Sequence, residues 1–171
     1  MTISKILELL PVPSDAVEEK DHNWAPIYSK LGTVLPQDYI EFLSIYGSGS
    51  IGDFLWVMNP HSQNRSLNLE QMQYFRDAYR VLRSDHPLYY PRKPDDFLPW
   101  AFTDNGDVVF WLKEGAKPDQ WLVGIQAADP TQEEQTDFTT SEFLEALLEK
   151  RLASSILPSQ FLEADKEFTP L

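Results

Sequence analysis

Apolar residues recur at intervals of three and four positions in five segments of the chain, a spacing that places them on one face of a helix. Three of these segments are followed by Pro11, Gly32 and Gly47, residues that end helices. The last segment opens with a capping box formed by Thr139 and Glu142. The pattern predicts amphipathic helices over residues 1–10, 24–31, 36–46, 69–82 and 139–152.

A different pattern, rich in β-branched and aromatic residues, predicts strands in the middle of the chain. Residues 54–58 are apolar throughout, which is typical of a strand covered on both faces. Residues 100–103 and 108–112 flank the Asn105-Gly106 pair, and because both members tolerate a positive φ, they predict a β-hairpin. Residues 121–126 add a third strand, which completes an antiparallel meander.

The remaining segments complete an α+β architecture. We expect the acidic stretch at residues 15–21 to be a loop, and the apolar residues of the tail, 154–171, to hold it against the body as an edge strand. With 171 residues, 42% of them hydrophobic, the chain can bury one sizeable core. We therefore expect a single domain over residues 1–171, in which an antiparallel sheet with a β-meander packs against several amphipathic helices.

Gly47, Gly49 and Gly52 have the G-x-G-x-x-G spacing of a dinucleotide-binding loop. Such a loop needs a strand before the glycines and a helix after them, because amides at the helix N-terminus bind the phosphates. Here the predicted helix comes first, and the negative end of its dipole repels a pyrophosphate. We interpret the glycines as a tight connection into the next strand and do not expect a nucleotide site.

Composition narrows the possible functions. The chain has no cysteine and three scattered histidines, His22, His61 and His86, so we expect no metal site and no cofactor. Twenty-seven acidic and 14 basic residues give a net charge of −13, which disfavours nucleic acid and membrane surfaces and favours a basic partner. A plainer interpretation is that the acidity keeps the protein soluble. Because no apolar run could span a membrane and no cleavable signal is evident, we expect a cytoplasmic protein.

Asp104 and Asp107 are the best candidates for acid–base catalysis, but they flank the predicted turn. A role in the turn is favoured, because aspartates there bond nearby amides and exposed carboxylates titrate normally. Residues 103–107 also lack the alternating oxygen ligands of a calcium-binding loop. With no nucleophile or phosphate-binding motif, we do not expect an enzyme. The predicted helix 69–82 carries three cations that we interpret as a solvated face rather than an anion site: Arg76, Arg80 and Arg83.

Three separated blocks of sequence occur in a characteristic order. They are W-x-x-I-x-x-x-L-G-x-x-L-P-x-D-Y at residues 24–39, F-L-x-x-Y-G-x-G-x-I-x-D-F-L-W-V at 42–57 and L-P-W-A-F-T-D-N-G-D-V-V-F-W at 98–111. Together they resemble the SUKH superfamily, of the Smi/Knr type, from about residue 24 to residue 152. The resemblance implies a non-enzymatic α+β domain. In bacteria such domains commonly act as immunity proteins that bind and block a toxin, often a nuclease, whereas fungal relatives are regulatory binding proteins.

An immunity role agrees with the acidic composition, because the substrate cleft of a nuclease is cationic. We expect carboxylates to cover the basic cleft of a nuclease-like toxin and to accelerate association, and we expect a monomer or a weak homodimer. The alternative is a regulatory scaffold of the fungal type, which long disordered flanks would favour. Three tryptophans are assigned to the core: Trp100, Trp111 and Trp121. The carboxylates assigned to partner binding are Asp53, Asp95, Asp96, Asp104, Asp107, Glu133, Glu134 and Asp137.

Overall fold

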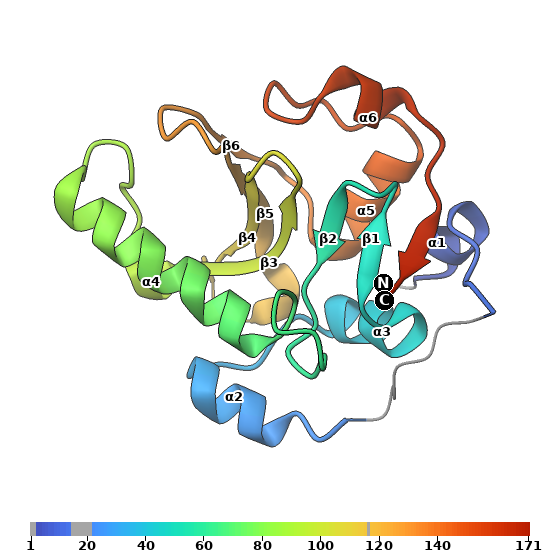
Figure 1. The fold of residues 1–171 in the computed structure, drawn as a ribbon, viewed down its shortest axis with the longest axis horizontal. Helices are drawn as coiled ribbons and strands as arrows, with labels where there is room; N and C mark the ends of the chain where they lie inside the picture. Colours follow the sequence, from blue (N-terminus) through green and yellow to red (C-terminus); the bar gives the residue numbers. More distant parts are fainter. Residues whose placement is uncertain (1–2, 15–21, 116) are drawn as a thin grey trace.

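One antiparallel sheet organises the fold, with the strand order β6-β5-β4-β3-β2-β1-β7 (Figure 1). The computed structural model describes residues 3–14, 22–115 and 117–171, so the predicted loop at 15–21 and the first two residues of the predicted helix 1–10 lie outside it. The strands are β1 (Gly49–Ile51), β2 (Leu55–Val57), β3 (Phe97–Thr103), β4 (Val108–Leu112), β5 (Leu122–Gln126), β6 (Glu133–Gln135) and β7 (Phe168–Pro170). The helices are α1 (Ser4–Leu9), α2 (Ala25–Leu31), α3 (Gln37–Tyr46), α4 (Leu69–Asp85), α5 (Thr140–Leu148), α6 (Ser159–Glu163) and the short 3-10 helices η1 (Pro94–Asp96) and η2 (Pro118–Gln120). The predicted α+β class and the β3-β4-β5 meander are confirmed.

Different helices cover the two faces of the sheet (Figure 1). On one face lies α4, where the Tyr79 ring stacks on Phe97 with centroids 4.2 Å apart. On the other face, α1, α2, α3 and α5 enclose the larger core. Successive side chains of β4 point to opposite faces of the sheet. Trp111 therefore packs in the larger core, whereas Phe110 packs with Tyr79 and Phe97 in a smaller cluster beneath α4.

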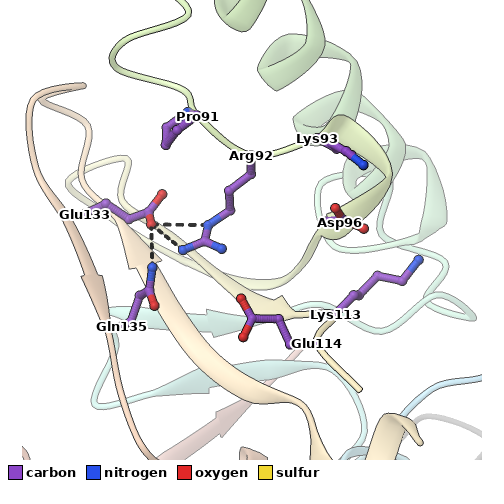
Figure 2. Close-up of a pocket in the computed structure, with 8 residues that line it drawn as sticks. All are labelled: Pro91, Arg92, Lys93, Asp96, Lys113, Glu114, Glu133 and Gln135. Atoms are coloured by element: carbon purple, nitrogen blue, oxygen red, sulfur yellow. Dashed lines mark hydrogen bonds and ion pairs between the residues drawn. The ribbon is translucent and has the colours of Figure 1, made fainter. Parts of the chain in front are cut away.

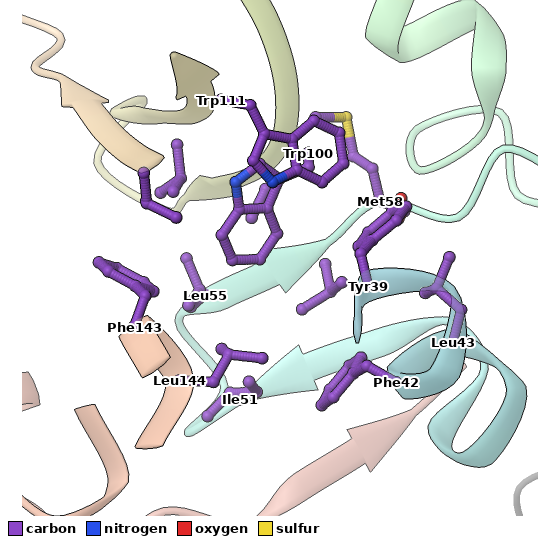
Figure 3. Close-up of a cluster of buried hydrophobic side chains, with 14 of the residues drawn as sticks. Tyr39, Phe42, Leu43, Ile51, Leu55, Met58, Trp100, Trp111, Phe143 and Leu144 are labelled. Atoms are coloured by element: carbon purple, nitrogen blue, oxygen red, sulfur yellow. The ribbon is translucent and has the colours of Figure 1, made fainter. Parts of the chain in front are cut away.

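Aromatic side chains fill the centre of the larger core (Figure 3). Trp100 and Trp111 are fully buried, with ring centroids 5.9 Å apart. Tyr39 packs edge-on against Trp111 at 4.9 Å and donates its hydroxyl to the carbonyl of Met58. Trp121 is also buried. The assignment of the three tryptophans to the core is therefore confirmed.

The β3-β4 hairpin forms where it was predicted, but its turn differs from the expected one. Four residues separate the strands, and the amide of Gly106 donates to the carbonyl of Thr103 at 2.9 Å. Gly106 has a φ of 87°, whereas Asn105 does not have a positive φ. Asn105 therefore does not use the positive φ that it tolerates, because the longer loop needs only its glycine in the left-handed region.

Two predicted elements are less regular than expected. Trp56, in the middle of β2, is partly exposed, so β2 is not covered on both faces. The last long helix, α5, begins with the predicted capping box but ends at Leu148. It ends early because Lys150 takes a φ of 61°, which lets the Leu152 amide bond back to the Ala146 carbonyl at 3.0 Å.

The glycine segment forms a strand that the sequence pattern did not predict. Helix α3 precedes the glycines, as expected, but Gly49–Ile51 then pairs with β2 on one side and with β7 on the other. A Cβ at Gly49 would lie 2.3 Å from the carbonyl oxygen of Thr169, so this position requires glycine. The tail thus forms an edge strand, as predicted. Strand β6, at the opposite edge, was also missed.

Candidate partner-binding surface

The eight carboxylates assigned to partner binding do not form one patch. Asp107, Glu133 and Glu134 make bonds inside the protein. Asp95 and Asp137 are exposed, and Asp96 is half-buried. The last two, Asp53 and Asp104, lie in adjoining turns, where the Asp104 amide donates to the carbonyl of Phe54 at 3.2 Å.

Asp107 connects two turns of the sheet. It is only 5% exposed, which corrects the view that both aspartates of this turn are exposed. Its Oδ2 accepts the hydroxyl of Thr103 at 2.8 Å, and its Oδ1 accepts the amide of Ala128 at 3.0 Å. The carboxylate therefore joins the β3-β4 turn to the loop after β5, which agrees with the predicted role in a turn rather than in chemistry.

Glu133 and Glu134, on the edge strand β6, are bonded to other parts of the chain. The largely buried guanidinium of Arg92 donates to Glu133 from Nη2 at 2.5 Å and from Nε at 3.2 Å (Figure 2). Glu134 accepts the hydroxyls of Ser154 and Ser155, each at 2.6 Å. Although partial burial opposes it, this hydrogen bonding lowers the pKa of Glu134. Both carboxylates fix the edge of the sheet.

Asp96 and Glu133 face a pocket in which the charges balance (Figure 2). The pocket has a volume of about 370 Å³ and is lined by Pro91, Arg92, Lys93, Asp96, Lys113, Glu114, Glu133 and Gln135. Its lining contains three cations and three carboxylates. Just outside, Asp95 is 85% exposed and lies 3.9 Å from the guanidinium of Arg76. Because the electrostatic fields of neighbouring opposite charges cancel one another away from the surface, this region does not present an acidic surface.

The arginines of α4 also differ from the solvated face that was predicted. The side chain of Arg76 is largely buried, and Arg83 donates to the carbonyl of Arg92 at 2.9 Å. Arg80 pairs with Asp77 on the same helix at 2.5 Å. Two of the three cations are therefore directed toward the loop between α4 and β3, and the prediction of one exposed basic face is wrong.

An acidic surface is present at the end of the sheet where Asp53 and Asp104 lie. We define the turn-end surface as residues 52–54, 104–106 and 158–167. Within these segments the sequence has one basic residue, Lys166, and five acidic ones, Asp53, Asp104, Glu163, Asp165 and Glu167. All five acidic residues are exposed, whereas Lys166 is buried and its Nζ donates to the carbonyl of Ala164 at 2.8 Å. Lys150 lies outside these segments but bonds to Asp165 at 2.5 Å. With that pair neutral, the remaining exposed charge of the surface is still negative, because Asp53, Asp104, Glu163 and Glu167 remain.

Hydrogen bonds orient the two carboxylates in the turns. Asp53 accepts the hydroxyl of Thr169 at 2.6 Å, and Asp104 accepts the indole N–H of Trp56 at 2.7 Å. Asp53 also has a φ of 49°, a conformation that aspartate and asparagine tolerate better than most residues. Each side chain is held by a neighbour through Oδ1 while the residue stays exposed. The turn-end surface thus presents its charge in a defined geometry.

A hollow with aromatic walls lies among these carboxylates. It has a volume of about 400 Å³, and its lining includes Phe54, Phe161, Asn105, Asp165 and Lys166. The rings of Phe54 and Phe161 are 4.7 Å apart. Lys150 bonds to Asp165 at 2.5 Å and lowers the pKa of that carboxylate. An apolar centre with a charged rim is the usual anatomy of a protein-binding surface.

Sequence reasoning identified only part of this surface. It selected Asp53 and Asp104, but not Glu163, Asp165 or Glu167, because no pattern indicated that the tail passes beside the two turns. The density of acidic residues in the tail was the available signal. Long-range contacts bring these segments together, among them the pairing of β7 with β1 and the bond from the Gly52 amide to the Glu167 carbonyl at 2.8 Å.

Two further findings concern the part of the chain that the structure describes. No group of three or more histidine, aspartate or glutamate side chains there could hold a metal ion. In the same residues, every helix is too short or too polar to cross a bilayer.

The fold and this surface describe an α+β protein with an antiparallel sheet and an acidic surface beside an aromatic hollow. The family model for the SMI1/KNR4 family (SUKH-1) matches residues 20–147, well over half of the chain. The protein therefore belongs to the SMI1/KNR4 (SUKH-1) family. The match covers most of the region from 24 to 152 in which the resemblance was found. No curated protein and no solved structure matches the chain.

Proposed function

We propose that this protein is an immunity protein that binds a cationic toxin domain, of the nuclease class, and blocks its substrate cleft without catalysing a reaction. The observation that carries the proposal is the turn-end surface, where the segments that form an aromatic hollow carry five exposed acidic residues, one of which, Asp165, lines the hollow. Membership of the SUKH-1 family supports a binding role. The net charge of −13 supports a basic partner.

The two parts of the surface have different physical roles. Exposed carboxylates attract a cationic partner over a distance of about one Debye length, roughly 8 Å at physiological salt, and so raise the association rate. Once the partner is bound, apolar contacts around Phe54 and Phe161 exclude water and slow dissociation. A substrate phosphate would then compete with carboxylates that already occupy the cationic cleft.

The test is co-expression of this protein with a toxin domain encoded by a neighbouring gene, scored by cell survival and by association kinetics at low and high salt. The test variant carries Asp53→Asn, Asp104→Asn and Asp165→Asn. Asparagine retains an oxygen acceptor at Oδ1 for Thr169 and Trp56, so the turns remain intact. We expect the association rate at low salt to fall by about tenfold or more.

The control variant removes the same amount of charge elsewhere, at exposed positions outside the turn-end surface: Glu8→Gln, Asp85→Asn and Glu114→Gln. This variant should keep most of the association rate and should protect cells. Equal effects of the two triple variants would refute the assignment of the surface. Failure to bind any cationic toxin domain, with binding only to regulatory proteins of the cell, would refute the immunity role in favour of a scaffold.

A further inference from the structure

A second hollow lies between α4 and the sheet, and it is apolar. This α4 groove has a volume of about 220 Å³. Its walls come from α4 and the loop after it, from β3, β4 and β5, and from the turns that follow β3 and β5: Tyr74, Phe75, Ala78, Tyr79, Leu82, Tyr90, Phe97, Gly106, Val108, Gln126, Ala127 and Ala128. The lining contains no charged residue. The volume is that of one large side chain rather than of an extended ligand.

Exposed apolar side chains gather beside the α4 groove. Tyr74 and Leu82, which line it, are exposed on α4, and the following loop exposes Leu88 and Tyr89. Tyr74 is 64% exposed and Leu88 is 91% exposed. Single exposed apolar residues are ordinary, but Tyr74 and Leu82 are exposed and also line a hollow, which favours a binding surface.

One residue of the lining, Gln126, has a buried polar atom that finds no partner in the described part of the chain. Gln126 is 5% exposed, and its Nε2 donates to the carbonyl of Gln132 at 3.0 Å. This bond identifies the nitrogen of the amide, so the other atom is the oxygen. That oxygen, Oε1, is buried and has no hydrogen-bond partner among the residues that the structure describes. A buried acceptor without a donor costs free energy, which a ligand that supplies an N–H or O–H would recover.

These features define the chemistry of the occupant. Apolar walls require an apolar body, and a single unpaired acceptor requires one donor near its end. A lysine or arginine does not fit, because the lining offers no carboxylate to compensate a buried charge. Tyrosine and tryptophan combine a large apolar ring with one donor, and they are the residues most enriched at the centres of protein interfaces.

We infer that the α4 groove binds a tyrosine or tryptophan side chain of the partner protein, whose hydroxyl or indole N–H donates to Oε1 of Gln126. The inference rests on the proposed function for the identity of that partner. The groove and the turn-end surface adjoin across one turn, because Asn105 lines the aromatic hollow and Gly106 lines the groove. One partner can therefore contact the acidic surface and insert an aromatic side chain into the groove.

The experiment needs no toxin and uses the full chain. N-acetyl-tyrosinamide and N-acetyl-phenylalaninamide, which differ by one hydroxyl, are titrated at millimolar concentrations into the ¹⁵N-labelled protein. We expect saturable amide shifts at Ala78, Gly106 and Ala127, with the tyrosine probe binding about fivefold more tightly, the value of one hydrogen bond. Gln126→Leu should abolish that difference while the phenylalanine probe still binds.

Two variants of α4 provide the matched comparison. Ala78→Phe fills the groove and should weaken both probes at least tenfold. Val81→Phe adds the same ring to an exposed position outside the groove lining and should change neither affinity. No saturable shifts at the groove, or equal affinities of the two probes for the unmodified protein, would overturn the inference. Shifts that depend on protein concentration without a probe would overturn it too, because a second copy would then be the occupant.

The two proposals fail separately. If neither probe binds in the titration, aromatic binding at the α4 groove is refuted, but the proposals for the turn-end surface and the immunity role are not affected. If the probes bind as expected but the protein neutralises no toxin, the immunity role is refuted, whereas aromatic binding at the groove is still supported.

Discussion

Replacing Asp107 with alanine tests whether this acidic residue serves the fold rather than a partner. The substitution leaves two donors, the Thr103 hydroxyl and the Ala128 amide, without the acceptors they now have at 2.8 and 3.0 Å. A hydrogen bond to a charged group contributes about 1.5–3 kcal/mol. The substitution also removes the cost of burying the carboxylate, and this gain offsets part of the stability lost with the two hydrogen bonds.

We expect the free energy of unfolding to fall by about 3 kcal/mol for Asp107→Ala, after allowing for that offset. For a chain of this size each kcal/mol lowers the melting temperature by about 2–4 °C, which gives a decrease of roughly 6–12 °C. Asp107→Asn should lose only about 1 kcal/mol, because one oxygen acceptor remains and the Thr103 hydroxyl can reverse its direction.

The assay is urea unfolding followed by tryptophan fluorescence, with thermal unfolding as a second measurement. The control is Asp137→Ala, which removes an exposed carboxylate and should change the stability by less than about 0.5 kcal/mol. If Asp107→Ala and Asp137→Ala were equally stable, the bonds that join the two turns would contribute nothing. The assignment of Asp107 to the fold would then be refuted.

Two further predictions concern other parts of the molecule. Gly49→Ala should destabilise the protein by about 1–3 kcal/mol, because the new Cβ would lie 2.3 Å from the Thr169 carbonyl oxygen. Amide hydrogen exchange in β7 should become faster, and an unchanged exchange rate there would contradict this prediction. Burial, and secondarily the nearby His22, lowers the pKa of His61, so the unfolded chain binds a proton there more readily than the folded one. The unfolding free energy should therefore decrease as the pH falls below about 6.5, and His61→Phe should flatten this part of the profile in urea titrations; a variant with the same slope would refute the assignment.

Local signals in the sequence predicted much of the fold. The helix before Gly47, the hairpin around Gly106 and the capping box of Thr139 and Glu142 each depend on residues close together in the chain. Such signals act through backbone conformation and short-range hydrogen bonds, so they can be identified without knowledge of the tertiary structure.

The missed elements depend on contacts between distant segments. Strands β1 and β6 have three residues each, too few to show a period of two. Their stability comes from neighbours instead, such as the pairing of Gly49–Ile51 with β7 and the bond from Arg92 to Glu133. The same limit applied to the candidate site, because spacing along the chain did not reveal that the tail passes beside the turns of Asp53 and Asp104.

Net charge is a poor guide to where an acidic protein binds, because internal bonds redistribute it. Asp107, Glu133 and Glu134 contribute to the formal charge of −13, yet each is bonded within the fold. At physiological salt an exposed charge acts over about 8 Å, so carboxylates on other faces contribute little to a partner at the turn-end surface. If the proposed cationic partner binds there, its affinity depends mainly on the few carboxylates beside the contact. Because Asp53 and Asp104 are held by Thr169 and Trp56, their geometry is set in advance, and the proposed binding would lose less side-chain entropy than it would with free carboxylates.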